Sequence, residues 1–328
     1  MTWVDGQASG RRTRSLREIR ADDILAITDI APHRHPVFRL RLAGDDASGT
    51  SMLVLKFEFA RDGGARFAAT TEIMQIVDPG AIAEVLSESE KRALFQAQSK
   101  GTPYLRECIQ VPGFIIVKMK HRKDFEDLQS PDPRSGLTEK QIRIIKAVLP
   151  KLVGNERVWR TLGEIVAVDL FLGNSDRIAP QERDPFDEKE YKGPGKAVLQ
   201  NAGNIFLKFD ESGELKKALA LDNYNARGSA TSLGEELPPD WLSGYAPILA
   251  SGGIMSLFSQ SVIKKVVRHG AKVGIEVELG EKERVCFFLG MRSGIEKIIA
   301  FLVQRTGQIG QRLQPGLVSR AKHLRWLS

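Results

Sequence analysis

The sequence predicts an α+β protein, and three observations lead to that class. Three β-prone apolar runs lie near the start of the chain, at 24–30, 37–42 and 51–56. Between residues 138 and 172, apolar residues recur at the three- and four-residue spacing of amphipathic helices. Farther on, two short apolar runs are joined by a turn at 210–213, which is the pattern of a β-hairpin.

The N-terminal elements predict a small sheet with one helix. The first two runs flank a segment, 31–36, that contains two prolines, and the third run ends on Lys56. Sixteen residues after Lys56, Glu72 lies in a segment with helical propensity, 67–74. The apolar run 113–119 is typical of a buried strand, and it leads into a charged stretch.

Two helices are expected in the middle of the chain. The first begins with a capping box at Thr138, and its apolar positions are Ile142, Ile145, Leu149 and Leu152. The second runs into Gly173, and one of its faces carries Val158, Leu162, Ile165, Val166 and Asp169. Because a carboxylate on an apolar face needs a buried partner, we interpret Asp169 as a structural residue first.

Three polar residues at the ends of apolar segments form the candidate site. Asp176 follows a Gly-Asn-Ser turn, which ends a helix and places the carboxylate on a loop that a hydroxyl can reach. Asn204 precedes the first hairpin strand, and Asp222 follows the second. Since the open ends of a hairpin lie side by side, Asn204 and Asp222 are expected to offer oxygen ligands to a hard cation such as Mg²⁺. Asn201 competes with Asn204, which we prefer because the apolar run begins directly after it.

On these residues the chain resembles the atypical kinases that include actin-fragmin kinase, the phosphoinositide kinases and the bacterial persistence-toxin kinases. The likeness to actin-fragmin kinase looks closest. It is carried by LGNSDR at 172–177, NAGNI at 201–205 and LDN at 221–223, and it is specific over about fifty residues. The resemblance implies a two-lobed protein-kinase-like fold, with a small β-rich N-lobe and a larger, mostly helical C-lobe.

The resemblance also implies ATP and Mg²⁺ as cofactors. Asp176 would be the catalytic acid, with Arg177 beside it, and Asn204 and Asp222 would hold the metal. For Arg177 two roles are open: neutralising charge on the transferred phosphate, or fixing the loop through an ion pair.

The nucleotide would be held by residues of the N-lobe. By resemblance, Lys56 contacts the phosphates, Glu72 orients Lys56 through an ion pair, and the backbone of Val117 and Met119 forms the hinge that contacts adenine. Three further acids lie near enough in sequence to be alternatives to Glu72, namely Glu58, Glu84 and Glu88.

The function implied is transfer of the ATP γ-phosphoryl group to a Ser or Thr hydroxyl of a protein. The same scaffold serves three alternatives: transfer of AMP or glutamate, phosphorylation of a lipid, and a pseudokinase that only binds a partner. Two departures from the family pattern favour the pseudokinase. Ile178 stands where many relatives have His, and residues 31–36 replace a glycine-rich loop, with Arg34 as an alternative phosphate ligand.

Length and composition fit this layout. We expect a mobile basic leader at 1–22, an N-lobe at 23–120, and a C-lobe at 121–328 with a polar insert at 179–195. The chain has 328 residues, 42% of them hydrophobic, and only two cysteines, which argues against a disulfide framework or a zinc site. We find no membrane-spanning run and no signal-peptide core. We therefore expect a cytoplasmic protein, or an effector exported into a host cell without a signal peptide.

Positive charge is concentrated toward the C-terminus. From residue 259 onward there are 13 Lys and Arg against 5 Asp and Glu, a net charge of +8, while the whole chain carries +7. Such a surface suits an acidic protein such as actin, or peripheral contact with an anionic membrane; the alternative is an ordinary solvated helical face. The charge does not predict a nucleic-acid partner, because no aromatic-interleaved basic motif accompanies it.

Overall fold

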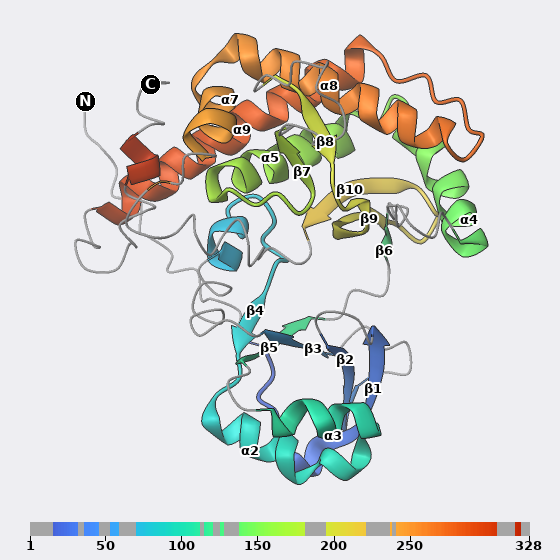
Figure 1. Cartoon of the computed structure of the whole chain (residues 1–328), viewed down its shortest axis with the longest axis vertical. Coiled ribbons are helices and arrows are strands. Elements are labelled where there is room, and N and C mark those ends of the chain that lie inside the picture. The colour runs from blue at the N-terminus through green and yellow to red at the C-terminus, as the bar shows by residue number, and fades with distance from the viewer. Residues whose placement is uncertain are drawn as a thin grey trace, which may run out of the picture.

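The computed structural model describes residues 16–31, 36–45, 53–58, 70–111, 115–120, 125–127, 138–180, 195–220, 237, 241–306 and 319–322. Within these ranges the protein is α+β, as predicted, with an antiparallel five-stranded sheet and a mostly helical remainder. Figure 1 shows the five-stranded sheet with helices α2 and α3 at one end of the molecule, and the long helices α5, α8 and α9 at the other.

The N-terminal sheet has the strand order β1-β2-β3-β5-β4, and every neighbouring pair is antiparallel. Its strands are β1 (Ile24–Ala31), β2 (Val37–Leu42), β3 (Leu53–Glu58), β4 (Ala83–Val85) and β5 (Ile115–Lys120). The helices beside it are η1 (Ala21–Asp23), α2 (Glu88–Gln96), η2 (Gln98–Lys100) and α3 (Pro103–Gln110). The four β-prone runs of the first 120 residues are thus confirmed as strands.

A first hydrophobic core lies between this sheet and the helices α2 and α3. Phe38 and Phe57 meet there edge to face, with ring centroids 5.4 Å apart. Ile19 belongs to the same core and is only 2% exposed. Residues 16–22, which we expected within a mobile leader, therefore pack against the folded protein. Residues 1–15 lie outside the described part of the chain.

A buried ion pair holds that N-terminal segment in place. Glu90 of α2 accepts hydrogen bonds from the Lys118 side chain at 2.5 Å and from the backbone N–H of Ile19 at 3.1 Å. Glu84 accepts from the backbone N–H of Leu16 at 2.7 Å. The carboxylates thus pair both a buried lysine and backbone donors that would otherwise lose their partners on burial.

The rest of the chain forms a second and larger hydrophobic core. Its first elements are β6 (Phe125–Asp127), α4 (Glu139–Val148), η3 (Leu149–Leu152), α5 (Glu156–Leu172), β7 (Ile178–Pro180), β8 (Ala197–Leu199), η4 (Ala202–Asn204), β9 (Ile205–Phe209) and β10 (Leu215–Ala220). The later elements are η5 (Trp241–Tyr245), α7 (Ala246–Ala250), α8 (Gly252–Ala271) and α9 (Glu281–Thr306), with a short helical piece at 319–322. Strands β10, β9 and β6 form one sheet, and β7 pairs with β8. The ends of the predicted polar insert are therefore joined, although residues 181–194 lie outside the described ranges.

Helices α5 and α9 cross at very short range in the middle of this core (Figure 1). A Cβ atom added at Gly163 of α5 would collide with the carbonyl oxygen of Phe287. One added at Gly290 of α9 would collide with the carbonyl oxygen of Arg160. Glycine is required at both positions because the obstacle is backbone, which cannot rotate away. The predicted helix ending at Gly173 is thus the buried central helix α5.

The segment before β4 packs where the sequence did not place it. Residues 70–74 are helical, as predicted, but Ile73 and Met74 belong to the second core. Asp78 accepts a hydrogen bond from the backbone N–H of Ala220 at 3.3 Å. Part of the expected N-lobe, 23–120, therefore packs with the larger core.

Membrane-spanning potential is weak among the described helices. None is long and apolar enough to cross a bilayer alone. One pair, Trp241–Ala250 with Gly252–Ala271, has the required length and composition when taken together, but it is bent by 103°.

Candidate functional site

The site is built around the C-terminal end of α5. Gly173 adopts a left-handed conformation, with φ of 69°, which a residue with a side chain rarely accepts. The N–H of Asn174 donates to the Asp169 carbonyl at 2.8 Å, and that of Gly173 donates to the Leu170 carbonyl at 3.2 Å. This closing motif ends the helix and turns the chain into a short segment, residues 173–177, which we call the loop.

A buried ion pair fixes both ends of the loop. The Arg177 guanidinium donates to the Asp169 carboxylate from Nε at 2.7 Å and from Nη2 at 2.5 Å. Asn174 Nδ2 donates to the same carboxylate at 3.0 Å. The pKa of Asp169 is raised on balance because complete burial outweighs the charge and hydrogen bonds of Arg177 and the hydrogen bond of Asn174, which lower it. Since a guanidinium does not lose its proton, its presence favours the ionised carboxylate.

These contacts bear on the two roles that were open for Arg177. Its side chain is fully buried and paired with Asp169, so it is not presented to a phosphate. This geometry favours the role of fixing the loop, and a catalytic role of Arg177 stays a prediction. The buried partner predicted for Asp169 is thereby identified.

Asp176 lies on the loop and is half-buried. Its backbone N–H donates to Asn174 Oδ1 at 3.0 Å, so the Asn174 side chain links the ion pair to the loop. Across 28 residues of sequence, Asn204 Nδ2 donates a hydrogen bond to Asp176 Oδ2. Two of the three predicted site residues therefore touch each other.

The side chain of Asn201, the alternative to Asn204, makes a different contact. It caps η4, and its Oδ1 accepts from the backbone N–H of Gly203 at 3.1 Å. Asn204 stands at the end of the same turn and directs its amide at Asp176. The structure therefore supports Asn204 over Asn201 as the site residue.

The predicted hairpin is confirmed, and its register is informative. Ile205, which directly follows Asn204, pairs with Ala220 at the end of β10. At the other end of the hairpin, Asp210 Oδ1 accepts from the backbone N–H groups of Ser212 and Glu214, which fixes the turn. Asp222 lies outside the described residues, so its approach to Asn204 stays a prediction. In the part of the chain that is described, no group of three His, Cys, Asp or Glu side chains could hold a metal ion.

Lys56 lies on β3, as predicted, and only 5% of it is exposed. It forms an ion pair with Glu58 at 2.6 Å, and Glu58 is one of the alternative acids in its neighbourhood. Glu72 is half-buried on the helical segment that joins the second core. The Lys56–Glu72 pair stays a prediction, and it would link the two cores.

Val117 and Met119 lie within β5, in the interior of the sheet. Val117 pairs with Lys56 on β3, and Met119 pairs with Val54 on the same strand, while β4 lies on the other side of β5. Backbone groups used in a sheet ladder are not free to contact a ligand. The adenine contact stays a prediction, and this register argues against it at these two residues. The residues directly after β5, 121–124, lie outside the described ranges.

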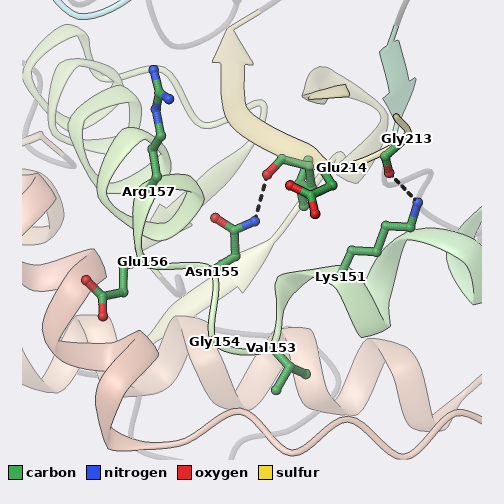
Figure 2. A pocket seen from close by; sticks show the side chains of 9 residues that line it. Lys151, Val153, Gly154, Asn155, Glu156, Arg157, Gly213 and Glu214 are labelled. Carbon is green, nitrogen blue, oxygen red and sulfur yellow. Dashed lines mark hydrogen bonds between the residues drawn. The ribbon is translucent and has the colours of Figure 1, made fainter. Parts of the chain in front are cut away.

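A cavity of about 580 Å³ lies away from this site, at the opposite end of α5. Figure 2 shows its lining, where Asn155 Nδ2 donates to the Leu215 carbonyl at 2.8 Å and Lys151 Nζ donates to the Gly213 carbonyl at 2.7 Å. Asn155 caps the first turn of α5, whereas Asp176 follows its last turn, and the helix between them is about 25 Å long. The cavity is therefore not part of the candidate site.

Comparison with protein-family models and with curated sequences identifies no relative of this chain. No protein-family model matches the chain, and no curated protein sequence matches it significantly. The functional argument therefore rests on the residues and their geometry.

Two residues near the site were not expected from sequence. Trp241 Nε1 donates to the Leu170 carbonyl at 3.0 Å, and Arg320 Nη1 donates to the Phe171 carbonyl at 2.7 Å. Both contacts are made to the last turn of α5 from far along the chain. No local pattern marks either residue, because each is defined only by its distant partner.

Proposed function

We propose that the protein is a magnesium-dependent kinase that transfers the γ-phosphoryl group of ATP to a Ser or Thr hydroxyl of a protein. The observation that carries this proposal is the contact between Asp176 and Asn204. It joins an acid on a fixed loop to an amide at the open end of a hairpin. Those are the positions at which kinase-like enzymes hold the catalytic acid and a metal ligand.

The architecture supports the same reading. A small antiparallel sheet with its own core and a larger helical part with a second core are what a two-lobed, kinase-like fold requires. Lys56 lies on the third strand, which is where protein kinases carry the lysine that contacts the phosphates.

Asp176 would align the acceptor hydroxyl and take its proton. A carboxylate has two oxygens and about four acceptor positions, so the hydrogen bond from Asn204 does not exhaust it. The loop is held by the buried Asp169–Arg177 pair, which keeps the carboxylate of Asp176 in one place. Fixed orientation is the main contribution that a protein makes to phosphoryl transfer.

The donor set fits Mg²⁺, which prefers carboxylate and amide oxygens. The nitrogen of the Asn204 amide faces Asp176, so the Asn204 oxygen would serve as the metal ligand. Asp222 would supply the second protein ligand. Magnesium, when bound, would neutralise charge on the phosphates.

The test is incubation with γ-labelled ATP and Mg²⁺, with and without a eukaryotic cell lysate. We expect label on a lysate protein, lost in Asp176→Ala and in Asp222→Ala. Glu211→Ala is the matched control, because Glu211 is an exposed acid on the turn of the same hairpin. A normal rate for Asp222→Ala would refute the metal assignment. Mass spectrometry of the product separates added phosphate from added AMP or glutamate.

One observation favours a second candidate, a pseudokinase that binds a partner without catalysis. Ile178 is 1% exposed and pairs with Leu199 in the β7–β8 ladder, so it cannot replace a polar group at the phosphate. Calorimetry with Mg-ATP separates the two candidates. Absence of both binding and label would favour the pseudokinase.

A further inference from the structure

Arg320 is a buried cation with no place in the chemistry proposed above. It lies on the short helical piece at 319–322, and its side chain is fully buried. Its Nη1 donates to the Phe171 carbonyl at 2.7 Å, across 149 residues of sequence. The guanidinium carbon also lies 5.2 Å from the centre of the Trp241 ring.

These contacts supply donors to carbonyls at the C-terminal end of α5. The last four carbonyls of an α-helix have no partner within the helix. Here the Asp169 carbonyl accepts from the loop, and the Leu170 carbonyl accepts from both the loop and Trp241. The Phe171 carbonyl accepts from Arg320. A cation is also favourable at this end of a helix, because the helix dipole is negative there.

We propose that Arg320 is a positioning residue for the loop, and that docking of the segment 319–322 sets the placement of Asp176. The inference rests on the proposed function for its catalytic consequence, but the positioning itself is a physical property that can be measured without activity.

The path from Arg320 to Asp176 is short. Phe171 precedes the loop by two residues, and the loop contains the Asn174 side chain that holds the Asp176 N–H. Removing the guanidinium leaves a buried carbonyl without this donor and opens space beside Trp241. A shift of about 1 Å in a catalytic group costs about a hundredfold in rate. The KM for ATP should not change, because no proposed nucleotide-binding residue is altered.

The experiment compares Arg320→Met with Lys322→Met. Lys322 lies on the same short helical piece but is exposed, so its substitution controls for a change of charge in that segment. The first readout is kcat and KM for ATP with labelled ATP and the lysate substrate. The second readout is hydrogen exchange of the backbone amides of residues 173–177. A third variant, Arg320→Ala, is assayed with and without millimolar guanidinium ion, which fits the vacated space.

We expect Arg320→Met to lower kcat by about tenfold to a hundredfold at unchanged KM. Exchange in the loop should become faster, while Lys322→Met should match the wild type in both readouts. Guanidinium ion should restore part of the lost rate in Arg320→Ala, and Arg320→Lys, which keeps a donor, should restore part of it without the ion.

Other outcomes would overturn the inference. Wild-type kcat and loop exchange in Arg320→Met would show that the contact does not position the loop. Faster exchange throughout α5 and α9 as well would show a general loss of stability instead. If Arg320→Met does not fold, Arg320→Lys and the guanidinium experiment decide, and failure of both to recover the loop would count against positioning. If the wild-type protein transfers no phosphate, the proposed function fails, and loop exchange alone decides on Arg320.

Discussion

Replacing Asp169 by asparagine is the sharpest test of how the site is held. The substitution keeps the volume of the side chain but removes its charge. The guanidinium of Arg177, which is fully buried, then loses its anionic partner. One carboxylate oxygen, which accepts a hydrogen bond, is also replaced by the NH2 group of the amide, which can only donate.

The magnitude follows from the contacts. Asp169 accepts three side-chain hydrogen bonds, two from Arg177 and one from Asn174. Each hydrogen bond to a charged group contributes about 1.5–3 kcal/mol, but bonds within one network do not add. Breaking a buried ion pair by removing one partner costs about 3–5 kcal/mol, and that is the loss of unfolding free energy we expect for Asp169→Asn.

The double variant Asp169→Leu with Arg177→Met supplies the comparison. It removes both charges together, and apolar replacement of a whole buried pair is often close to neutral. Asn174 would still lose one acceptor, which costs about 1 kcal/mol, and the other contacts of Arg177 would be lost as well. The double variant should therefore be more stable than Asp169→Asn.

Urea unfolding followed by tryptophan fluorescence measures these differences. Trp159 and Trp241 are both buried in the second core, so their emission reports on the part of the protein that contains the pair. Glu278→Gln, a substitution at an exposed acid, should change the unfolding free energy by less than about 0.5 kcal/mol. The reasoning fails if Asp169→Asn costs less than about 1 kcal/mol, or if the double variant is the less stable of the two.

Three further predictions concern acid stability, helix packing and the metal site. Burial would raise the pKa of Glu90, but the hydrogen bonds that it accepts outweigh this effect and lower the pKa. Ionised Glu90 therefore stabilises the fold above the ordinary pKa of a glutamate, and this contribution is lost as the pH falls. Glu90→Gln should lower the unfolding free energy by about 2 kcal/mol at neutral pH, and the difference from wild type should shrink below about pH 4 in denaturant titrations. Gly163→Ala should lower the unfolding free energy by about 1–3 kcal/mol or more in the same assay. Gly280→Ala is the control, because its added methyl meets no atom within 4 Å and should not destabilise the protein. Equal stability of the two variants would contradict the close crossing of α5 and α9. Asn204→Ala should raise the Mg²⁺ concentration needed for half-maximal phosphoryl transfer. Asn201→Ala should lower the unfolding free energy by about 1 kcal/mol and leave the Mg²⁺ dependence unchanged. The reverse pattern would make Asn201 the metal ligand and Asn204 the structural residue.

Local patterns predicted the parts of this fold that local forces determine. The β-hairpin was expected from two apolar runs and a turn, and Asp210 closes that turn through contacts within four residues. Asp169 was expected to need a buried partner because its neighbours at helical spacing are apolar. That partner, Arg177, lies only eight residues away.

Packing between distant segments was the part that local patterns missed. The helical segment at 70–74 was recognised, but its apolar residues Ile73 and Met74 fit either core by composition, and the structure places them in the second. The run at 113–119 was predicted to be a buried strand, and the resemblance to the atypical kinases implied that it is the hinge. It is the strand β5 between β3 and β4, and its contact with adenine stays a prediction.

The positions of the charged side chains could not be predicted either, because a count of charged residues does not say where each side chain lies. The net +8 of the C-terminal seventy residues was interpreted as a surface for an acidic partner. Arg320 contributes to that count, yet it is buried against α5. Lys282 and Lys297 are paired with Glu156 and Glu164 of α5, at 3.1 Å and 2.6 Å.

Three of the exposed cations in the described part of this region follow one face of α8. Lys264, Arg268 and Lys272 recur every four residues, so they lie in one row near the end of that helix. Like charges at this spacing repel one another, and an anionic partner would relieve the repulsion. This row on α8 is therefore one exposed positive surface in the described part of the chain, whereas Lys282 and Lys297 are paired with acids of α5.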